Sequence, residues 1–257
     1  MRKFQLLPYN PEYPKLFEEY SKELKEALTT NIKQIYHIGS SSVPGLVSKP
    51  TIDIICVVKD LKTVKEPILK LGYITKGELN IPLRIYFERN DNVHVHVMLE
   101  TCGEIKWNVM FRDYLREHED AREKYNSVKL DLVKNNPNGF IRIKNSISEY
   151  TLKKGEIVCE ILKKAGFDGY KFVIGLNEYE IGECEKLLGK IELKENNCRL
   201  CLYKGMDING AAYVEVNDNN LVIIKINGKN KDDIKFLQER IKEWADYHDW
   251  NLKIEKM

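Results

Sequence analysis

Hydrophobic and polar positions repeat along this chain with two periods, one typical of helices and the other of strands. Residues 11–29 place apolar side chains every three or four positions with charged ones between them, which predicts an amphipathic helix. Residues 34–38 and 51–58 are short apolar runs rich in β-branched side chains, as buried strands are. Residues 83–89 and 93–99 read as two further strands, and the three polar residues between them predict a β-hairpin.

Helical spacing returns in three later stretches. These are residues 61–71, 105–133 and 146–164, and Pro67 is expected to interrupt or kink the first of them.

The pattern changes at Ala165-Gly166, which reads as a domain boundary. Beyond it we expect a strand, a short helix, three strands, a longer helix and a final strand. The sequence therefore predicts an α+β protein of two domains, residues 1–166 and a smaller α+β domain of unknown role at 167–257.

The turn between the first two predicted strands carries candidate chemistry. Gly39 lets the backbone approach a ligand closely. Ser40 and Ser41 then offer hydroxyls and successive N–H donors, a combination that suits an anion such as phosphate. The alternative is an ordinary polar loop with no ligand.

Asp53 is the single charge inside the apolar run 51–58. An ionised carboxylate in a core is costly, so this side chain needs a partner, a cation or water. It could hold a divalent cation that bridges phosphate oxygens, and Lys49 could add a positive charge. The alternative is a buried structural partner.

Residues 37–54 read HIGSSSVPGLVSKPTIDI, and the motifs LGY (71–73), HVHV (94–97) and FRDYLR (111–116) follow in order. This ordered series resembles the GrpB, or UPF0157, family over about residues 4–165. The resemblance implies a nucleotidyltransferase-like fold, a mixed sheet packed with helices, in which a Gly-Ser pair precedes a strand bearing metal-binding carboxylates. It implies much less about activity, because the family has no well-established reaction.

One position departs from the pattern of active nucleotidyltransferases. The resemblance matches Gly39, Ser40 and Asp53, but a second acidic residue is expected two positions after the first, where this chain has Ile55. Strand alternation places residues 53 and 55 on the same face. Either another residue completes the metal site, or metal-dependent transfer is weak or absent.

Two histidines share one face of the strand 93–99. His94 and His96 point one way and the valines between them the other. They could ligate a metal together with Asp53, and His37 could join them. The alternative is that they line a cleft and hydrogen-bond substrate or backbone.

Three arginines are further candidates for binding phosphate. Arg84 lies on the strand that partners the histidines. Arg112 and Arg116 are one helical turn apart, so they could clamp phosphate together, or they could instead meet nearby acids such as Asp113.

Composition and charge indicate in which compartment the protein is expected and which partners are unlikely. No apolar run approaches a membrane span, no signal peptide is expected, and the six scattered cysteines fit reduced thiols in a cytoplasm. Cys198 and Cys201 form a lone C-x-x-C in a strand pattern, which we interpret as two ordinary thiols. The net charge of +2 makes nucleic acid an unlikely partner.

Three hypotheses of function remain. The first is a transferase of the nucleotidyltransferase type that uses Asp53, His94 and His96, with Mg²⁺ or, if the histidines ligate, another divalent metal. The second is a module that binds a nucleotide or phosphorylated ligand without turnover. The third is assistance to the folding of a partner or of the attached domain. Whether the protein is an enzyme, its acceptor, its nucleobase and its oligomeric state stay open.

Overall fold

The computed structural model describes residues 5–90, 92–143 and 147–254. The fold is a mixture of helices and mixed β-sheets, as the sequence predicts, and it divides into two compact units. Unit 1 is formed by residues up to 79 together with 84–167. Unit 2 is formed by 80–83 together with the residues from 168 onward. In the described part of the chain, no helix is long and apolar enough to cross a membrane.

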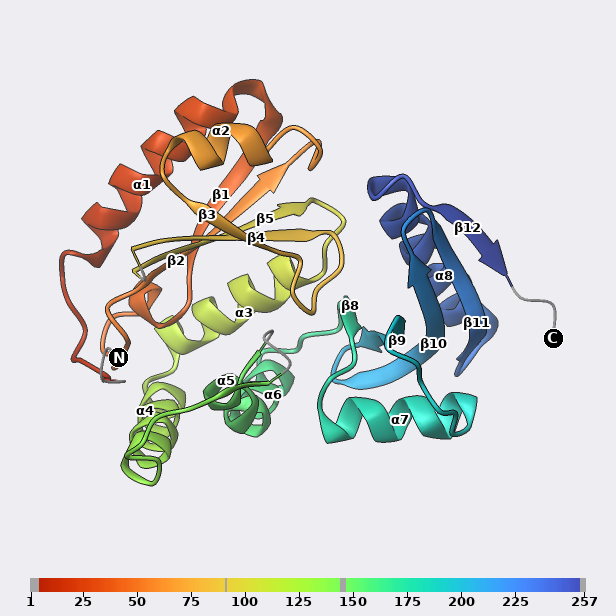
Figure 1. Cartoon of the computed structure of the whole chain (residues 1–257). Helices are drawn as coiled ribbons and strands as arrows, with labels where there is room; N and C mark the ends of the chain where they lie inside the picture. Colours follow the sequence, from red (N-terminus) through yellow and green to blue (C-terminus); the bar gives the residue numbers. More distant parts are fainter. Residues whose placement is uncertain (1–4, 91, 144–146, 255–257) are drawn as a thin grey trace. The chain divides into compact units, whose positions relative to one another are not determined.

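Unit 1 is built on a five-stranded mixed sheet with the order β1-β2-β5-β4-β3 (Figure 1). Its strands are β1 (Ile32–Ile38), β2 (Ile52–Val58), β3 (Ile74–Gly77), β4 (Arg84–Arg89) and β5 (Val93–Leu99). Strands β2 and β5 pair in parallel, and the other neighbours are antiparallel. The predicted hairpin is β4–β5, although Asp91 in its turn lies outside the described residues.

Helices cover both faces of this sheet, which explains why β2 is an almost unbroken apolar run. In Figure 1, α1 and α2 lie on one face and α3 on the other. The helical elements of unit 1 are α1 (Tyr13–Leu28), η1 (Thr29–Asn31), η2 (Ser40–Ser42), α2 (Lys65–Lys70), α3 (Glu104–Glu117), α4 (Glu119–Lys134), α5 (Glu149–Lys153) and α6 (Gly155–Lys164). A two-stranded sheet, β6 (Arg142–Ile143) and β7 (Ile147–Ser148), precedes α5.

Several predicted helices differ in their limits. The stretch 105–133 breaks at His118, whose extended backbone ends α3 and begins α4. The helix predicted at 61–71 is reduced to α2, where Pro67 lies in the first turn and so costs no intrahelical hydrogen bond. The helix predicted at 146–164 is two helices, α5 and α6, and residue 146 lies outside the described residues.

A second core of unit 1 forms away from the sheet. Helices α3, α4 and α6 bury side chains such as Leu115, Tyr125 and Ile161 against the loop that follows η2. That loop contributes Val43 and Leu46, which are each 1% exposed. The helical layer thus anchors the turn between β1 and β2.

Unit 2 is a five-stranded sheet with the order β12-β11-β10-β9-β8. Its elements are β8 (Tyr170–Ile174), α7 (Glu178–Leu188), β9 (Asn197–Lys204), β10 (Asp207–Asn217), β11 (Asn220–Gly228), α8 (Lys231–Tyr247) and β12 (Asn251–Ile254). Helix α7 packs on the face that carries Cys201 and Tyr203, whereas Leu237 of α8 lies against Gly210 on the other face. Residues 80–83 belong to this unit, and the Asn80 carbonyl accepts a hydrogen bond from the Ile174 N–H at 2.9 Å.

Candidate functional site

A single glycine shapes the turn after β1. Gly39 has a φ of +69°, a left-handed conformation that side chains rarely adopt. The η2 turn follows, and the Ser42 hydroxyl donates to the Gly39 carbonyl at 2.6 Å. A Cβ at position 39 would lie 2.4 Å from Oδ2 of Asp53, well inside van der Waals contact. Glycine therefore allows the Asp53 carboxylate to lie directly against the turn.

Asp53 and His94 face each other on the parallel strands β2 and β5. They are register partners, and His94 Nδ1 donates to Asp53 Oδ1 at 3.0 Å. Burial alone would raise the pKa of Asp53, but the hydrogen bond and charge of His94, helped by Lys49, hold that pKa below its ordinary value. The side chains stay 27% and 24% exposed. The pair is an ionised carboxylate and an oriented imidazole that a ligand can reach.

His96 and Arg84 lie further along the same face of the sheet. Burial, reinforced by the charge of Arg84, lowers the pKa of His96 to about 3, so this ring is neutral near pH 7. Arg84 is the register partner of Met98 and donates from Nη2 to the Glu78 carbonyl at 3.0 Å. Arg84 therefore lies toward the far end of β5 and is not brought beside Asp53.

Lys129 of α4 is buried against the η2 turn. Only 1% of it is exposed, and its Nζ donates to the Val47 carbonyl and lies 3.4 Å from the Ser40 hydroxyl. Burial, with a smaller contribution from Lys154, lowers the pKa of Lys129 to about 7. No carboxylate of the described residues lies within ion-pair distance of this amine.

Lys154 and Lys49 lie near Asp53 from two other segments. Lys154 joins α5 to α6, and its Nζ is 4.3 Å from the centroid of the Tyr150 ring. Burial lowers the pKa of Lys154 to about 8, against the opposing effect of Asp53. The Nζ of Lys49 is 5.6 Å from the same Tyr150 ring.

We call Asp53, His94, Lys49, Lys129 and Lys154 the Asp53 cluster. Its three lysines outnumber its one carboxylate, and lysine is a common binder of phosphate. It does not make a metal site by itself. Among the residues that the structure describes, no group of three or more His, Cys, Asp or Glu side chains is placed to hold a metal ion.

The other serine of the predicted phosphate turn is engaged elsewhere. Ser41 is 1% exposed, and its hydroxyl lies 3.1 Å from Nε2 of His37. Burial is the main cause that lowers the pKa of His37 to about 4, so its ring is neutral near pH 7. Ser41 and His37 thus stiffen the turn from within, while Ser40 faces Lys129.

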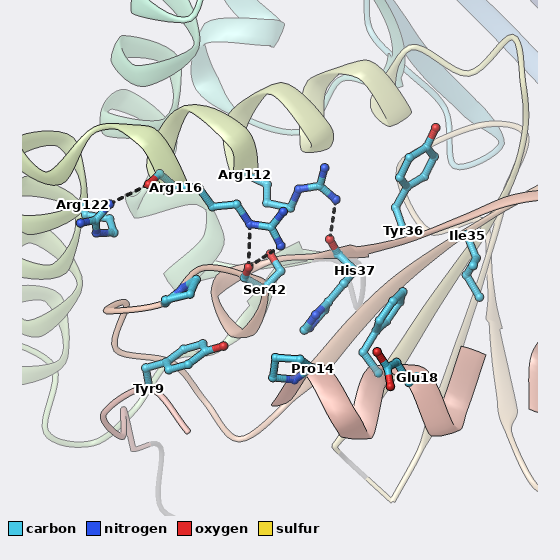
Figure 2. A pocket seen from close by; sticks show the side chains of 12 residues that line it. Tyr9, Pro14, Glu18, Ile35, Tyr36, His37, Ser42, Arg112, Arg116 and Arg122 are labelled. Atoms are coloured by element: carbon cyan, nitrogen blue, oxygen red, sulfur yellow. Dashed lines mark hydrogen bonds between the residues drawn. The ribbon is translucent and has the colours of Figure 1, made fainter. Parts of the chain in front are cut away.

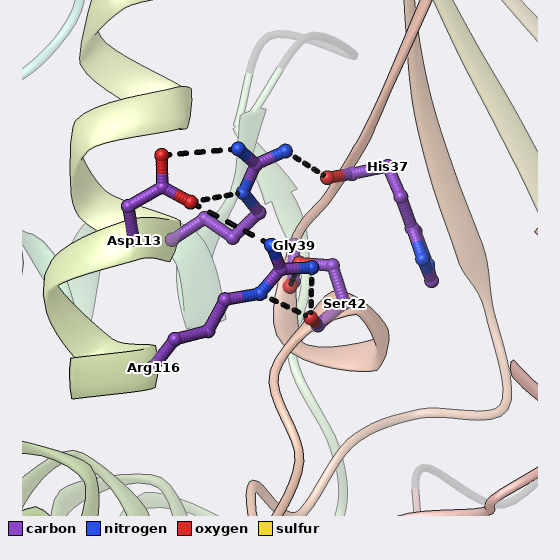
Figure 3. A network of polar contacts seen from close by, with 6 residues as sticks. His37, Gly39, Ser42, Asp113 and Arg116 are labelled. Carbon is purple, nitrogen blue, oxygen red and sulfur yellow. Dashed lines mark hydrogen bonds and ion pairs between the residues drawn. The ribbon is translucent and has the colours of Figure 1, made fainter. Parts of the chain in front are cut away.

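Arg112 and Arg116 lie at a different surface, the outer edge of β1. A cavity of about 630 Å³ lies there, and Figure 2 shows the side chains that line it. Arg112 is bound to both carboxylate oxygens of Asp113, at 2.7 and 3.0 Å, and donates to the His37 carbonyl at 3.0 Å. Arg116 donates to the Ser42 carbonyl at 2.7 and 3.0 Å (Figure 3). Arg112 and Arg116 therefore brace the turn from outside.

Sequence reasoning missed Lys129, although the sequence holds a signal for it. Ala121 and Tyr125 form the buried stripe of α4 at a spacing of four, and Lys129 occupies the next position of that stripe. A lysine on the apolar face of a helix therefore points to a buried amine. Lys154 has no such signal, because the exposed Lys153 beside it looks the same in the sequence.

The fold and the cluster together define an α+β protein whose mixed sheet presents a lysine-rich cluster beside a Gly-Ser turn. A family model described as GrpB protein matches residues 3–164. The chain therefore belongs to the GrpB family, and the match ends just before unit 2 resumes at residue 168.

Relatives support this assignment. UPF0157 protein YqkA of Bacillus subtilis is 33% identical over 161 residues, which cover 60% of this chain and 45% of that protein. UPF0157 protein BH1888 of Halalkalibacterium halodurans is 34% identical over 167 residues, 62% of this chain and 81% of that protein. The crystal structure of conserved protein GrpB from Enterococcus faecalis is similar, with a TM-score of 0.56 and 30% identity, and it covers 63% of this chain and 96% of that one.

Proposed function

We propose that unit 1 binds a small phosphorylated ligand, a nucleotide in the first instance, with a phosphate held by Lys49, Lys129 and Lys154. One observation carries the proposal: Lys129 is 1% exposed and has no carboxylate partner among the described residues. A buried amine without a counter-ion costs stability, because its charged form loses hydration. A bound phosphate offsets that cost by supplying the missing negative charge.

The remaining groups fit the same role. Ser40 offers a hydroxyl 3.4 Å from the Lys129 amine, so one phosphate oxygen can meet both. Asp53 accepts from Nδ1 of His94 and so fixes the ring, which leaves Nε2 as the nitrogen available to a ligand. The predicted Mg²⁺ stays a prediction, since Asp53 and His94 do not make a metal site alone.

Isothermal titration calorimetry with ATP, ADP and inorganic pyrophosphate tests the proposal, each in EDTA and in Mg²⁺. The variants are Lys129→Met, Lys154→Met and, as a matched control, Lys153→Met, because Lys153 is paired with Glu149 at 2.8 Å and is 39% exposed. We expect at least about tenfold weaker binding in the first two variants and unchanged binding in the control. If neither ATP nor pyrophosphate binds the wild type, or if Lys129→Met binds equally well, the proposal is wrong.

Nucleotidyl transfer is the second candidate, favoured by the Asp53–His94 pair beside Gly39. Ile55, at the position of the second carboxylate, is 0% exposed and offers no ligand. Release of pyrophosphate from ATP, lost in Asp53→Ala, would distinguish transfer from binding alone. A role limited to assisting folding predicts that none of the lysine variants changes any ligand affinity.

A further inference from the structure

Strand β1 forms one edge of the sheet of unit 1. It pairs with β2 on one side, and no strand of the described chain pairs with its other side. The Ile52 N–H donates to the Asn92 carbonyl, on the β5 side of β2, so the backbone groups of the next residue, Asp53, and of Ile55 point toward β1. Asp53 and Ile55 are the register partners of Ile38 and Tyr36. The alternate residues of β1, Ile35 and His37, therefore direct their backbone N–H and C=O groups away from the sheet.

The outward carbonyl of His37 is already taken by Arg112 at 3.0 Å. This bond confirms the direction in which the His37 backbone points. Three outward groups remain for a partner: the N–H and C=O of Ile35 and the N–H of His37. Such a row of edge groups is a template for an added strand.

The cavity of about 630 Å³ lies along this edge. Figure 2 shows α3 on one side of β1, with Arg112 and Arg116, and α1 on the other, with Pro14 and Glu18. Phe17 of α1 also lines the cavity and stacks on the His37 ring at 4.7 Å. One wall is therefore cationic and the other largely apolar.

The charge of the cationic wall is only partly balanced. Arg112 is paired with Asp113, whereas Arg116 is 41% exposed and lies 3.6 Å from the same carboxylate. Arg122 donates to the carbonyls of Leu115 and Arg116, which carry no formal charge. The lining contains three arginines and one acidic residue, Glu18, so its excess of positive charge favours an acidic occupant.

We propose that this edge groove, formed by the outer edge of β1 between α1 and α3, binds an extended acidic segment of a partner protein by strand addition. The segment pairs with Ile35 and with the His37 N–H. Because side chains alternate along a strand, one set meets the arginines of α3 and the other meets Phe17 and Pro14 of α1. The expected recognition pattern is therefore acidic residues alternating with apolar ones.

Fluorescence anisotropy on the full chain tests the pattern with a labelled heptapeptide of alternating glutamate and valine. A lysine–valine peptide of the same length is the charge control. Two further probes carry N-methyl groups on every glutamate amide or on every valine amide. An added strand uses the N–H groups of one edge only, so we expect one methylated peptide to bind at least about tenfold more weakly and the other to bind normally. Equal binding by both methylated peptides, or no binding by the unmethylated one, overturns the proposal.

Two variants and one spectroscopic readout complete the test. Arg116→Glu should lower the affinity for the acidic peptide at least about tenfold, because it reverses one charge on the cationic wall. Lys129→Met should leave this affinity unchanged, because Lys129 belongs to the Asp53 cluster and not to the groove. Amide exchange by NMR should show that the Ile35 and His37 N–H groups become protected when the peptide binds. Protection elsewhere with none at these two positions would place the peptide on another surface.

Discussion

The amine of Lys129 and the hydroxyl of Ser40 lie 3.4 Å apart, although 89 positions separate them in the chain. The contact joins helix α4 to the turn between β1 and β2. It puts a fully buried lysine against a group that the sequence already marks for phosphate.

Lys129→Met should make the free protein more stable while it weakens ligand binding. The methionine fills similar volume and removes a buried amine that must otherwise stay desolvated. We expect the free energy of unfolding at pH 7 to rise by about 1 to 4 kcal/mol. Urea denaturation of the wild type and the variant, both without ligand, measures this free energy. A lower value in the variant would show that the Lys129 amine stabilises the fold.

Ligand binding should weaken as pH rises from 7.5 to 9.5. The pKa of Lys129 is about 7 and that of Lys154 about 8 in the free protein, so most Lys129 amines are already neutral at pH 7.5 and Lys154 becomes neutral across this range. A bound phosphate favours the protonated amines, and binding must then take up protons. Calorimetry of pyrophosphate binding in two buffers of different ionisation enthalpy measures the uptake. Release of protons, or a flat affinity, would contradict the assignment.

Acid should destabilise the protein before its carboxylates titrate. The pKa of His37 is lowered to about 4 in the folded state, below the ordinary value of 6.5. Stability is therefore complete above pH 6.5 and is lost as pH falls toward 4, because only the unfolded chain takes up the proton. His37 accounts for a loss of up to about 3 kcal/mol in the free energy of unfolding. His96, whose pKa is also lowered, contributes a further loss. Urea unfolding of His37→Phe at pH 7 and pH 4 should show a smaller difference than the wild type.

Gly39→Ala should be more damaging than Gly45→Ala. Both glycines have positive φ, +69° and +85°, so both variants carry a backbone strain of about 1 to 3 kcal/mol. At position 45 the new methyl group meets its nearest atom, Arg122 Nε, at 3.5 Å, which is ordinary contact. At position 39 it would displace the Asp53 carboxylate. We expect only Gly39→Ala to lose ligand affinity, which calorimetry with ATP measures, and equal effects would disprove the close approach.

The sequence predicted the parts of this molecule that depend on local pattern. Alternation puts His94 and His96 on one face of β5, and the apolar run of β2 carries Asp53, but the sequence leaves open whether these side chains meet. The structure makes His94 and Asp53 register partners. The break at His118 was missed because the apolar spacing of α3 continues into α4 in the sequence, whereas the second core requires the two helices to diverge.

The candidate site was less predictable, because most of it comes from packing between distant segments. Arg112 looks like a phosphate clamp in the sequence, but three of its five N–H donors are taken by Asp113 and the His37 carbonyl. Ser41 looks equivalent to Ser40, yet the turn points one hydroxyl at His37 and brings the other to Lys129. No local pattern carries this difference.

The Asp53 cluster is assembled from five segments of the chain: the loop before β2, which carries Lys49, then β2, β5, α4 and the junction of α5 with α6. During synthesis, therefore, the cluster cannot form until the ribosome has released the chain past Lys154, when nearly all of unit 1 has emerged. A ligand that binds there recognises the finished unit and ignores every shorter nascent chain. Occupancy of the cluster would then act as a quality check on the completed domain, favouring it over partly made molecules by mass action.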